Sequence, residues 1–140
     1  MKKSLIVMLS LLTVLLFATS IASADGQVIT TEEFGSSTIG LEFPNYGSAR
    51  TNEANEIIGY RGINLGLGYS SKHYFEPLKA ETFNPYWQWG TVGLILPYAG
   101  VGGDYVFAVD QEAGNFWTVG GSINLVTVIP APQITLSYKF

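Results

Sequence analysis

The stretch that decides the fold is ITLSYKF, residues 134–140, in which apolar and polar side chains alternate without exception. Successive side chains of a β-strand point to opposite faces, so a period of two predicts a strand with one apolar face. The apolar face carries Ile134, Leu136, Tyr138 and Phe140. The polar face carries Thr135, Ser137 and Lys139. We expect this segment to be the last strand of a sheet.

The same alternation recurs towards the N-terminus and predicts an all-β chain with six clear strands. They span residues 36–44, 57–69, 86–97, 98–109, 115–128 and 132–140. Glycine recurs throughout this region, and each glycine inside a helix costs about 1 kcal/mol, which disfavours helices. Residues 27–34 and 72–80 are candidates for two more strands, and association of subunits is another way to close a barrel. Two longer polar connections, 45–56 and 70–85, are expected to be loops.

The composition indicates which face of the strands points outward. Only 13% of the residues are charged, whereas a typical soluble domain has about 25%. The face opposite the apolar one consists mainly of Gly, Ser, Thr and Asn, which suit a narrow interior better than a soluble exterior. Membrane barrels place apolar residues outside, polar residues inside and aromatic residues near the strand ends. We therefore predict an antiparallel up-and-down transmembrane β-barrel of six or eight strands.

A few charged residues lie on or beside the polar faces of the predicted strands. They are Glu42, Arg61, Asp104 and Lys139. In a barrel whose interior is filled by side chains, we expect them to form internal salt bridges, since buried charges need partners. A solute-selective constriction is the alternative.

Residues 1–24 have the features of a secretory signal peptide, with Lys2 and Lys3 before an apolar run and Ala-Ser-Ala at 22–24. Cleavage would leave a barrel domain of residues 25–140 that begins at Asp25. Two of the seven basic residues and none of the eleven acidic ones would be lost, which changes the net charge from −4 to −6. An acidic chain is not expected to bind nucleic acid. The absence of cysteine excludes a lipoprotein anchor and a cysteine-ligated zinc site.

Two segments resemble bacterial outer-membrane β-barrel proteins. The last strand resembles their C-terminal strand, which ends in Phe, with an aromatic residue two positions earlier and apolar residues at alternate positions. PYAGVGGDY at 97–105 resembles a "PY-G-G-GY" strand of small opacity-protein-like, porin-family barrels. The resemblance implies location in the cell outer membrane, contact with its lipid, and eight strands in most small members. It also implies that Ile134, Leu136, Tyr138 and Phe140 form the signal read by the barrel-assembly machinery.

No catalytic, cofactor or metal site is predicted. Ser71, His73 and Glu76 offer a nucleophile, a base and an orienting carboxylate, but they fall in an expected loop, without the spacing found in outer-membrane lipid deacylases. We expect a structural or surface-interaction role through the loops 45–56 and 70–85, if these face outward. A soluble periplasmic lipocalin-like binder of small ligands and a narrow passive pore are the alternatives. Homo-oligomers are compatible with all three.

Overall fold

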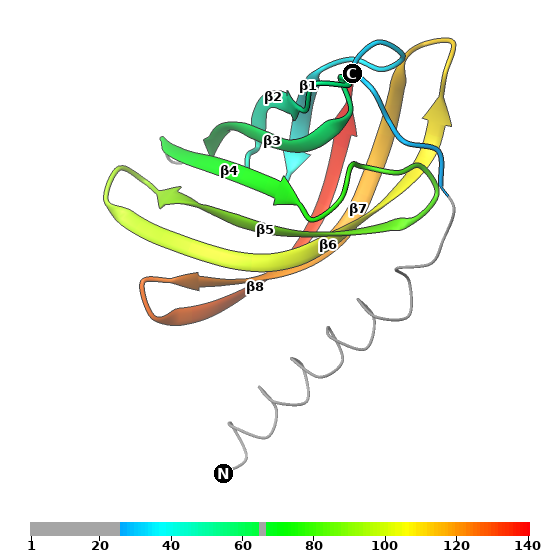
Figure 1. The fold of residues 1–140 in the computed structure, drawn as a ribbon. Coiled ribbons are helices and arrows are strands. Elements are labelled where there is room, and N and C mark those ends of the chain that lie inside the picture. Colours follow the sequence, from blue (N-terminus) through cyan, green and yellow to red (C-terminus); the bar gives the residue numbers. More distant parts are fainter. Residues whose placement is uncertain (1–25, 65–66) are drawn as a thin grey trace, which may run out of the picture.

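The computed structural model describes residues 26–64 and 67–140, which form eight antiparallel strands closed into a barrel (Figure 1). Each strand pairs with the next, and β1 pairs with β8, so the topology is up-and-down. The strands are β1 (Ser37–Leu41), β2 (Tyr46–Thr51), β3 (Ile57–Asn64), β4 (Gly68–Tyr74), β5 (Phe83–Val92), β6 (Leu96–Asp110), β7 (Asn115–Val126) and β8 (Ile129–Lys139). The predicted all-β, up-and-down barrel is confirmed. The predicted signal peptide lies outside the described residues.

The two strands that the sequence left open are not where we expected them. β2 lies within the predicted loop 45–56, and β4 begins in the predicted strand 57–69 and runs into the predicted loop 70–85. Residues 27–34 make only isolated bridges, Val28 with Lys79 and Thr30 with Glu56, so they are not a barrel strand. Residues 72–80 contribute only the end of β4. One chain closes the barrel, and a second subunit is not needed for closure.

The two ends of the barrel differ in chemistry. Because the strands alternate in direction, the connections 42–45, 65–67, 93–95 and 127–128 share one end, called here the turn end. Its connections contain no charged residue other than Glu42, and Leu94, Ile95 and Val128 are about four-fifths exposed. The connections 52–56, 75–82 and 111–114 share the other end with residues 26–36 and Phe140, and this is the termini end. Its loops expose the carboxylates Glu32, Glu33, Glu53, Glu76, Glu81 and Glu112.

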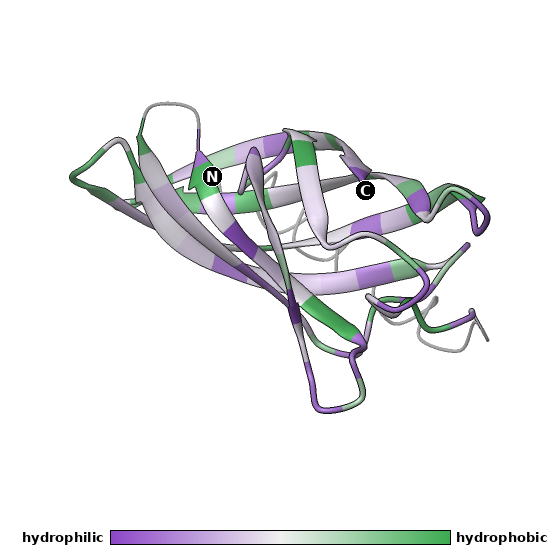
Figure 2. Ribbon diagram, turned by 90° about the horizontal axis from the view of Figure 1, so that it is seen from above, coloured by the Kyte–Doolittle hydropathy of each residue, from purple (hydrophilic) through white to green (hydrophobic). Residues whose placement is uncertain are grey.

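Between these ends, the barrel has a polar interior and a largely apolar outer wall. Hydrophilic and hydrophobic residues alternate along the strands (Figure 2). The buried polar residues of the strands are Thr38, Asn64, Ser70, Ser71, Lys72, Asn84, Gln88, Asp104, Thr118, Ser122, Asn124, Thr135, Ser137 and Lys139. Exposed strand residues include Ile39, Leu41, Ile63, Trp87, Trp89, Val101, Trp117, Val119, Leu125, Ile134 and Leu136. Within residues 26–64 and 67–140, no helix is long and apolar enough to cross a membrane.

An apolar cluster closes the interior at the termini end. The N-terminal segment brings Ile29 and Phe34 over the barrel, and the loop after β4 adds Leu78; all three are buried. Backbone hydrogen bonds hold the cap, from Ile29 N to Leu78 O (2.8 Å) and from Ile57 N to Ile29 O (3.0 Å). Burying each such side chain contributes about 1.5–3 kcal/mol. We call residues 26–36 the N-terminal cap.

The barrel wall is taller on one side than on the other. β5 to β8 have 10 to 15 residues, whereas β1 to β4 have only five to eight. A tilted strand needs about 9–11 residues to cross a bilayer core. The predicted strands 36–44 and 57–69 reach this length, but the observed ones do not. The chain turns after β1 at residues 42–45, and it reverses between Asn64 and Gly68, which separates β3 from β4.

Candidate functional site

Four charged side chains meet inside the barrel and form the interior charge cluster, namely Glu42, Lys72, Asp104 and Lys139. All four are fully buried. Lys72 Nζ lies 2.5 Å from Glu42 Oε2 and 2.9 Å from Asp104 Oδ2. Lys139 Nζ forms an ion pair with the other oxygen, Glu42 Oε1. Two ammonium and two carboxylate groups therefore balance, as buried charges must.

Hydroxyl groups and aromatic rings complete the cluster. Tyr74 Oη donates a hydrogen bond to Asp104 Oδ2 (2.7 Å), and Thr135 Oγ1 donates to Asp104 Oδ1 (3.3 Å). Lys139 Nζ donates to Thr38 Oγ1 (2.7 Å). The ammonium groups also lie over aromatic faces, with Lys72 Nζ 4.1 Å from the ring centre of Tyr86 and Lys139 Nζ at the same distance from Tyr60. Such contacts add an electrostatic attraction to each ammonium group in a water-poor interior. The cluster cross-links the wall from within.

The structure separates the four charged residues that the sequence grouped together. Glu42, Asp104 and Lys139 lie together in the interior, whereas Arg61 is exposed on the outer wall of β3. Arg61 lies outside the barrel because it alternates in phase with the outward-facing Ile63. Lys72, the central cation of the cluster, was missed because it was assigned to a loop. Tyr69 and His73 are four positions apart and share the outward face of one strand, so Lys72, next to His73, falls on the inward face. This alternation is the signal that predicts Lys72 as an interior residue.

The predicted assembly residues all lie on the outer face of β8 or at its end. Ile134 is 86% exposed, Leu136 and Phe140 are about two-fifths exposed, and Tyr138 packs between Trp117 and Phe140. Phe140 also joins the two ends of the sheet, because Ser37 N donates to Phe140 O (2.7 Å) and Phe140 N donates to Ser37 O (3.0 Å). These side chains are accessible from outside the barrel.

Ser71 and His73 are brought together, but Glu76 is not. Ser71 Oγ lies 2.9 Å from His73 Nε2, on β4 rather than in a loop. Arg50 Nη1 lies against the same imidazole, which stacks on Trp87 with ring centres 4.2 Å apart. Among the described residues, no carboxylate forms a hydrogen bond with this imidazole. Glu76 instead pairs with Lys79 (3.1 Å).

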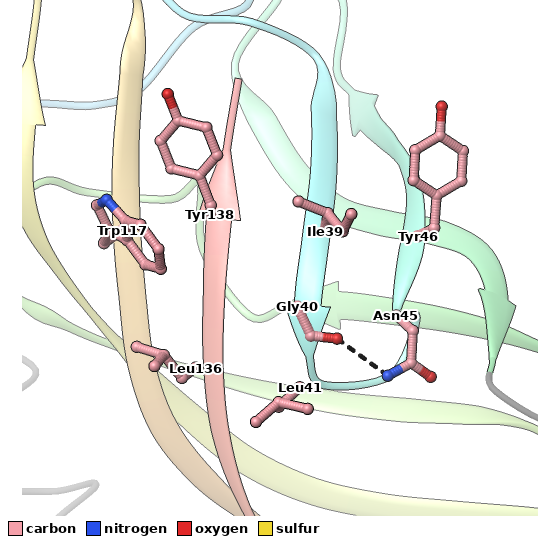
Figure 3. Close-up of a pocket in the computed structure, with 8 residues that line it drawn as sticks. All are labelled: Ile39, Gly40, Leu41, Asn45, Tyr46, Trp117, Leu136 and Tyr138. Atoms are coloured by element: carbon pink, nitrogen blue, oxygen red, sulfur yellow. Dashed lines mark hydrogen bonds between the residues drawn. The ribbon is translucent and has the colours of Figure 1, made fainter.

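An apolar groove of about 610 Å³ crosses the outer wall where β1 meets β8 (Figure 3). Its lining comes from β1, β2, β7, β8 and the turn between β1 and β2, and comprises Ile39, Gly40, Leu41, Asn45, Tyr46, Trp117, Leu136 and Tyr138. Asn45 Nδ2 donates to Gly40 O (3.0 Å) and fixes the turn at its edge. The hydroxyl groups of Tyr46 and Tyr138 both point away from Leu41 and Leu136, towards the termini end. We call this the seam groove.

Among the described residues, no group of three histidine, aspartate or glutamate side chains is placed to hold a metal ion. No family model, curated protein or solved structure matches the chain. The fold and the interior define the class as a small, closed, eight-stranded β-barrel with a polar, salt-bridged interior.

Proposed function

We propose that the protein is a small β-barrel of the bacterial outer membrane, opacity-protein-like, with a structural or surface-interaction role and no catalytic activity. In this proposal a signal peptide at residues 1–24 exports it, and the barrel-assembly machinery inserts it by reading the outer face of β8. The observation that carries the proposal is the inverted distribution of side chains, with charged residues buried inside and leucine, isoleucine and tryptophan exposed outside.

The main alternative is a soluble lipocalin-like binder, which needs the opposite distribution. In such a barrel the apolar faces would line a ligand cavity. Here the interior at the level of Glu42 and Lys72 is occupied by fully buried charged side chains. An outer wall with exposed tryptophan and leucine side chains would be costly in water, whereas lipid stabilises it. These features favour the membrane barrel.

The interior also argues against a passive pore. The interior charge cluster spans from Lys139 on β8 to Lys72 on β4, and the N-terminal cap covers one end. Eight-stranded barrels have an interior that side chains just fill. We therefore favour a structural role over conduction.

Orientation changes the surface through which the protein would interact. If the termini face the periplasm, the loops 52–56 and 75–82 face it too, because they share the termini end. In that orientation, neither of these two loops faces the outside of the cell. The outward surface would be the turn end, with its exposed Leu94, Ile95 and Val128.

Tryptophan fluorescence tests the proposal directly, because Trp87, Trp89 and Trp117 are the only tryptophans of the chain and all are exposed on the outer wall. In vesicles with brominated acyl chains, we expect strong quenching by the lipid and little quenching by aqueous acrylamide. The soluble alternative predicts the reverse. Fractionation of cells gives an independent result, since recovery in the soluble periplasm would rule out the proposed location.

A further inference from the structure

The outer wall carries a cationic patch on its short side. Arg50 on β2 and Arg61 on β3 share the outward phase with Tyr46 and Ile63. Ser48 pairs with Arg61 and Arg50 pairs with Gly59, so the two arginines are diagonal neighbours on adjacent strands, about 7–8 Å apart. The only acidic residues in the described strands are Asp104, which is inside, and Asp110, at the end of β6. Among the described residues, no carboxylate forms an ion pair with Arg50 or Arg61.

A second groove, of about 350 Å³, contains Arg61. Its other lining residues are Ser37, Tyr46, Gly47, Ser48, Gly62 and Ile63. Ser37, Ser48 and Arg61 form one row across β1, β2 and β3, since Ser37 pairs with Ser48 and Ser48 pairs with Arg61. Within residues 26–64 and 67–140, no hydrogen bond or ion pair engages the Arg61 side chain. A guanidinium and two hydroxyl groups are thus available to one ligand.

This polar groove adjoins the seam groove, and Tyr46 lines both. The row that contains Ser37 and Ser48 lies one outward-facing position nearer the termini end than the row that contains Ile39 and Tyr46. The Tyr46 hydroxyl points towards that polar side, and Leu41 and Leu136 lie on the other (Figure 3). Together the two grooves present a cation with hydroxyl groups at one end and an apolar channel at the other. This arrangement matches a lipid with an anionic headgroup.

We propose that this surface is a binding site for one phosphate-bearing anionic lipid. Its phosphate lies at Arg61, Ser37 and Ser48, and one acyl chain lies in the seam groove along Ile39, Leu41 and Leu136. This inference rests on the proposed membrane location and adds the class of ligand. Guanidinium groups bind phosphate through two parallel hydrogen bonds, so an unpaired arginine suits this headgroup.

The short wall explains why a headgroup can reach a residue partway along the barrel. β1 to β4 are shorter than a bilayer core requires, and a bilayer thins beside a short hydrophobic wall. Thinning brings the phosphate level of the termini-end leaflet down towards Arg61. A second copy of the chain is a poorer partner, because its strands would offer apolar groups or the same cations.

Lipid counting by native mass spectrometry tests the site. The refolded barrel in maltoside micelles is titrated with phosphatidylglycerol or phosphatidylcholine of equal chain length. We expect a preference for phosphatidylglycerol, and Arg61→Gln should weaken its binding about fivefold, the effect of one basic side chain on an anionic lipid. Phosphatidylcholine binding should weaken less, because its choline cation already compensates the phosphate charge. Lys79→Gln, which removes a partly exposed cation at the termini end, is the matched control and should alter neither lipid.

A second variant and a free anion separate the two halves of the site. Ile39→Trp should fill the seam groove and weaken both lipids, while the interior charge cluster and the fold remain intact. Inorganic phosphate alone should not displace the lipid; displacement at millimolar concentration would mean a simple anion site and overturn the proposal. Equal binding of both lipids by the wild type, or equal losses in Arg61→Gln and Lys79→Gln, would also overturn it. Insertion into vesicles without any preference refutes this site alone, whereas failure to insert refutes the proposed function.

Discussion

Removing the carboxylate of Glu42 is the most informative perturbation of the barrel, because this side chain joins both buried lysines. In Glu42→Gln the shape of the side chain is kept, and the hydrogen bond from Thr38 Oγ1 (3.0 Å) can persist. Lys72 retains its ion pair with Asp104 at 2.9 Å. Lys139 has no other carboxylate partner among the described residues. The variant therefore leaves one buried ammonium group without a counter-charge.

The size of the effect follows from the burial of both partners. Both side chains of the Lys139–Glu42 pair are 0% exposed, so water cannot replace the lost charge. Breaking a buried pair by removing one partner costs about 3–5 kcal/mol, because the remaining charge stays desolvated. Removing both partners in Glu42→Gln with Lys139→Met should restore most of that loss. The double variant leaves Lys72 and Asp104 as one balanced pair.

Urea-induced unfolding in detergent micelles, followed by tryptophan emission and by heat-modifiable gel migration, measures the difference. Glu76→Gln is the matched control, since its pair with Lys79 has side chains 70% and 30% exposed, and an exposed pair contributes less than about 1 kcal/mol. An equal decrease in the free energy of unfolding for Glu42→Gln and Glu76→Gln would refute the reasoning. A double variant that is as unstable as the sum of the two single ones would refute it as well.

Three further predictions address packing, assembly and the closed interior. Gly120→Ala should lower the free energy of unfolding by about 1–3 kcal/mol, because the added Cβ would lie 1.9 Å from Gly103 O. Gly121→Ala is the control: the nearest atom to its added Cβ is 3.3 Å away, so the same urea titration should show a much smaller loss of stability. Phe140→Ser should slow assembly in a folding-gel time course, while Val128→Ser, an exposed turn-end change, should not. Phe34→Ala should cost about 3–5 kcal/mol by removing a buried ring that packs edge-to-face on Phe116 (5.5 Å), yet planar-bilayer recordings should show no conductance, because the interior charge cluster still fills the barrel.

The sequence predicted the second half of the barrel well, because both faces of these strands follow the alternation. Residues 134–140 have an uninterrupted period of two, and β8 has the predicted phase, with Leu136 outside and Ser137 inside. Lys139 could be assigned to the interior from its neighbours alone. The period and phase of the alternation are therefore enough to predict a strand and its inward face where the outward residues are apolar.

The first half was harder to predict, because several outward residues of β2 and β4 are polar. On β2 the outward positions include Ser48 and Arg50, so the strand has no apolar face in the sequence and resembles a loop. Between β3 and β4 the alternation continues through Leu65 and Leu67, which conceals the turn. The alternation places Glu42 on a polar face but does not show that Lys72 is its partner, because Lys72 approaches it from a distant strand.

The short first strand also bears on how the proposed lipid would affect the barrel. β1 has five residues and pairs with only three residues of β2 and four of β8, so the sheet is least secure on the two sides of β1. The seam groove lies across this junction. A molecule that binds only the closed form stabilises it by about 2.7 kcal/mol at a hundredfold excess over its dissociation constant. With the proposed lipid bound there, a larger anionic fraction of the bilayer would stabilise the closed barrel. Amide exchange in β1 should therefore slow as that fraction rises.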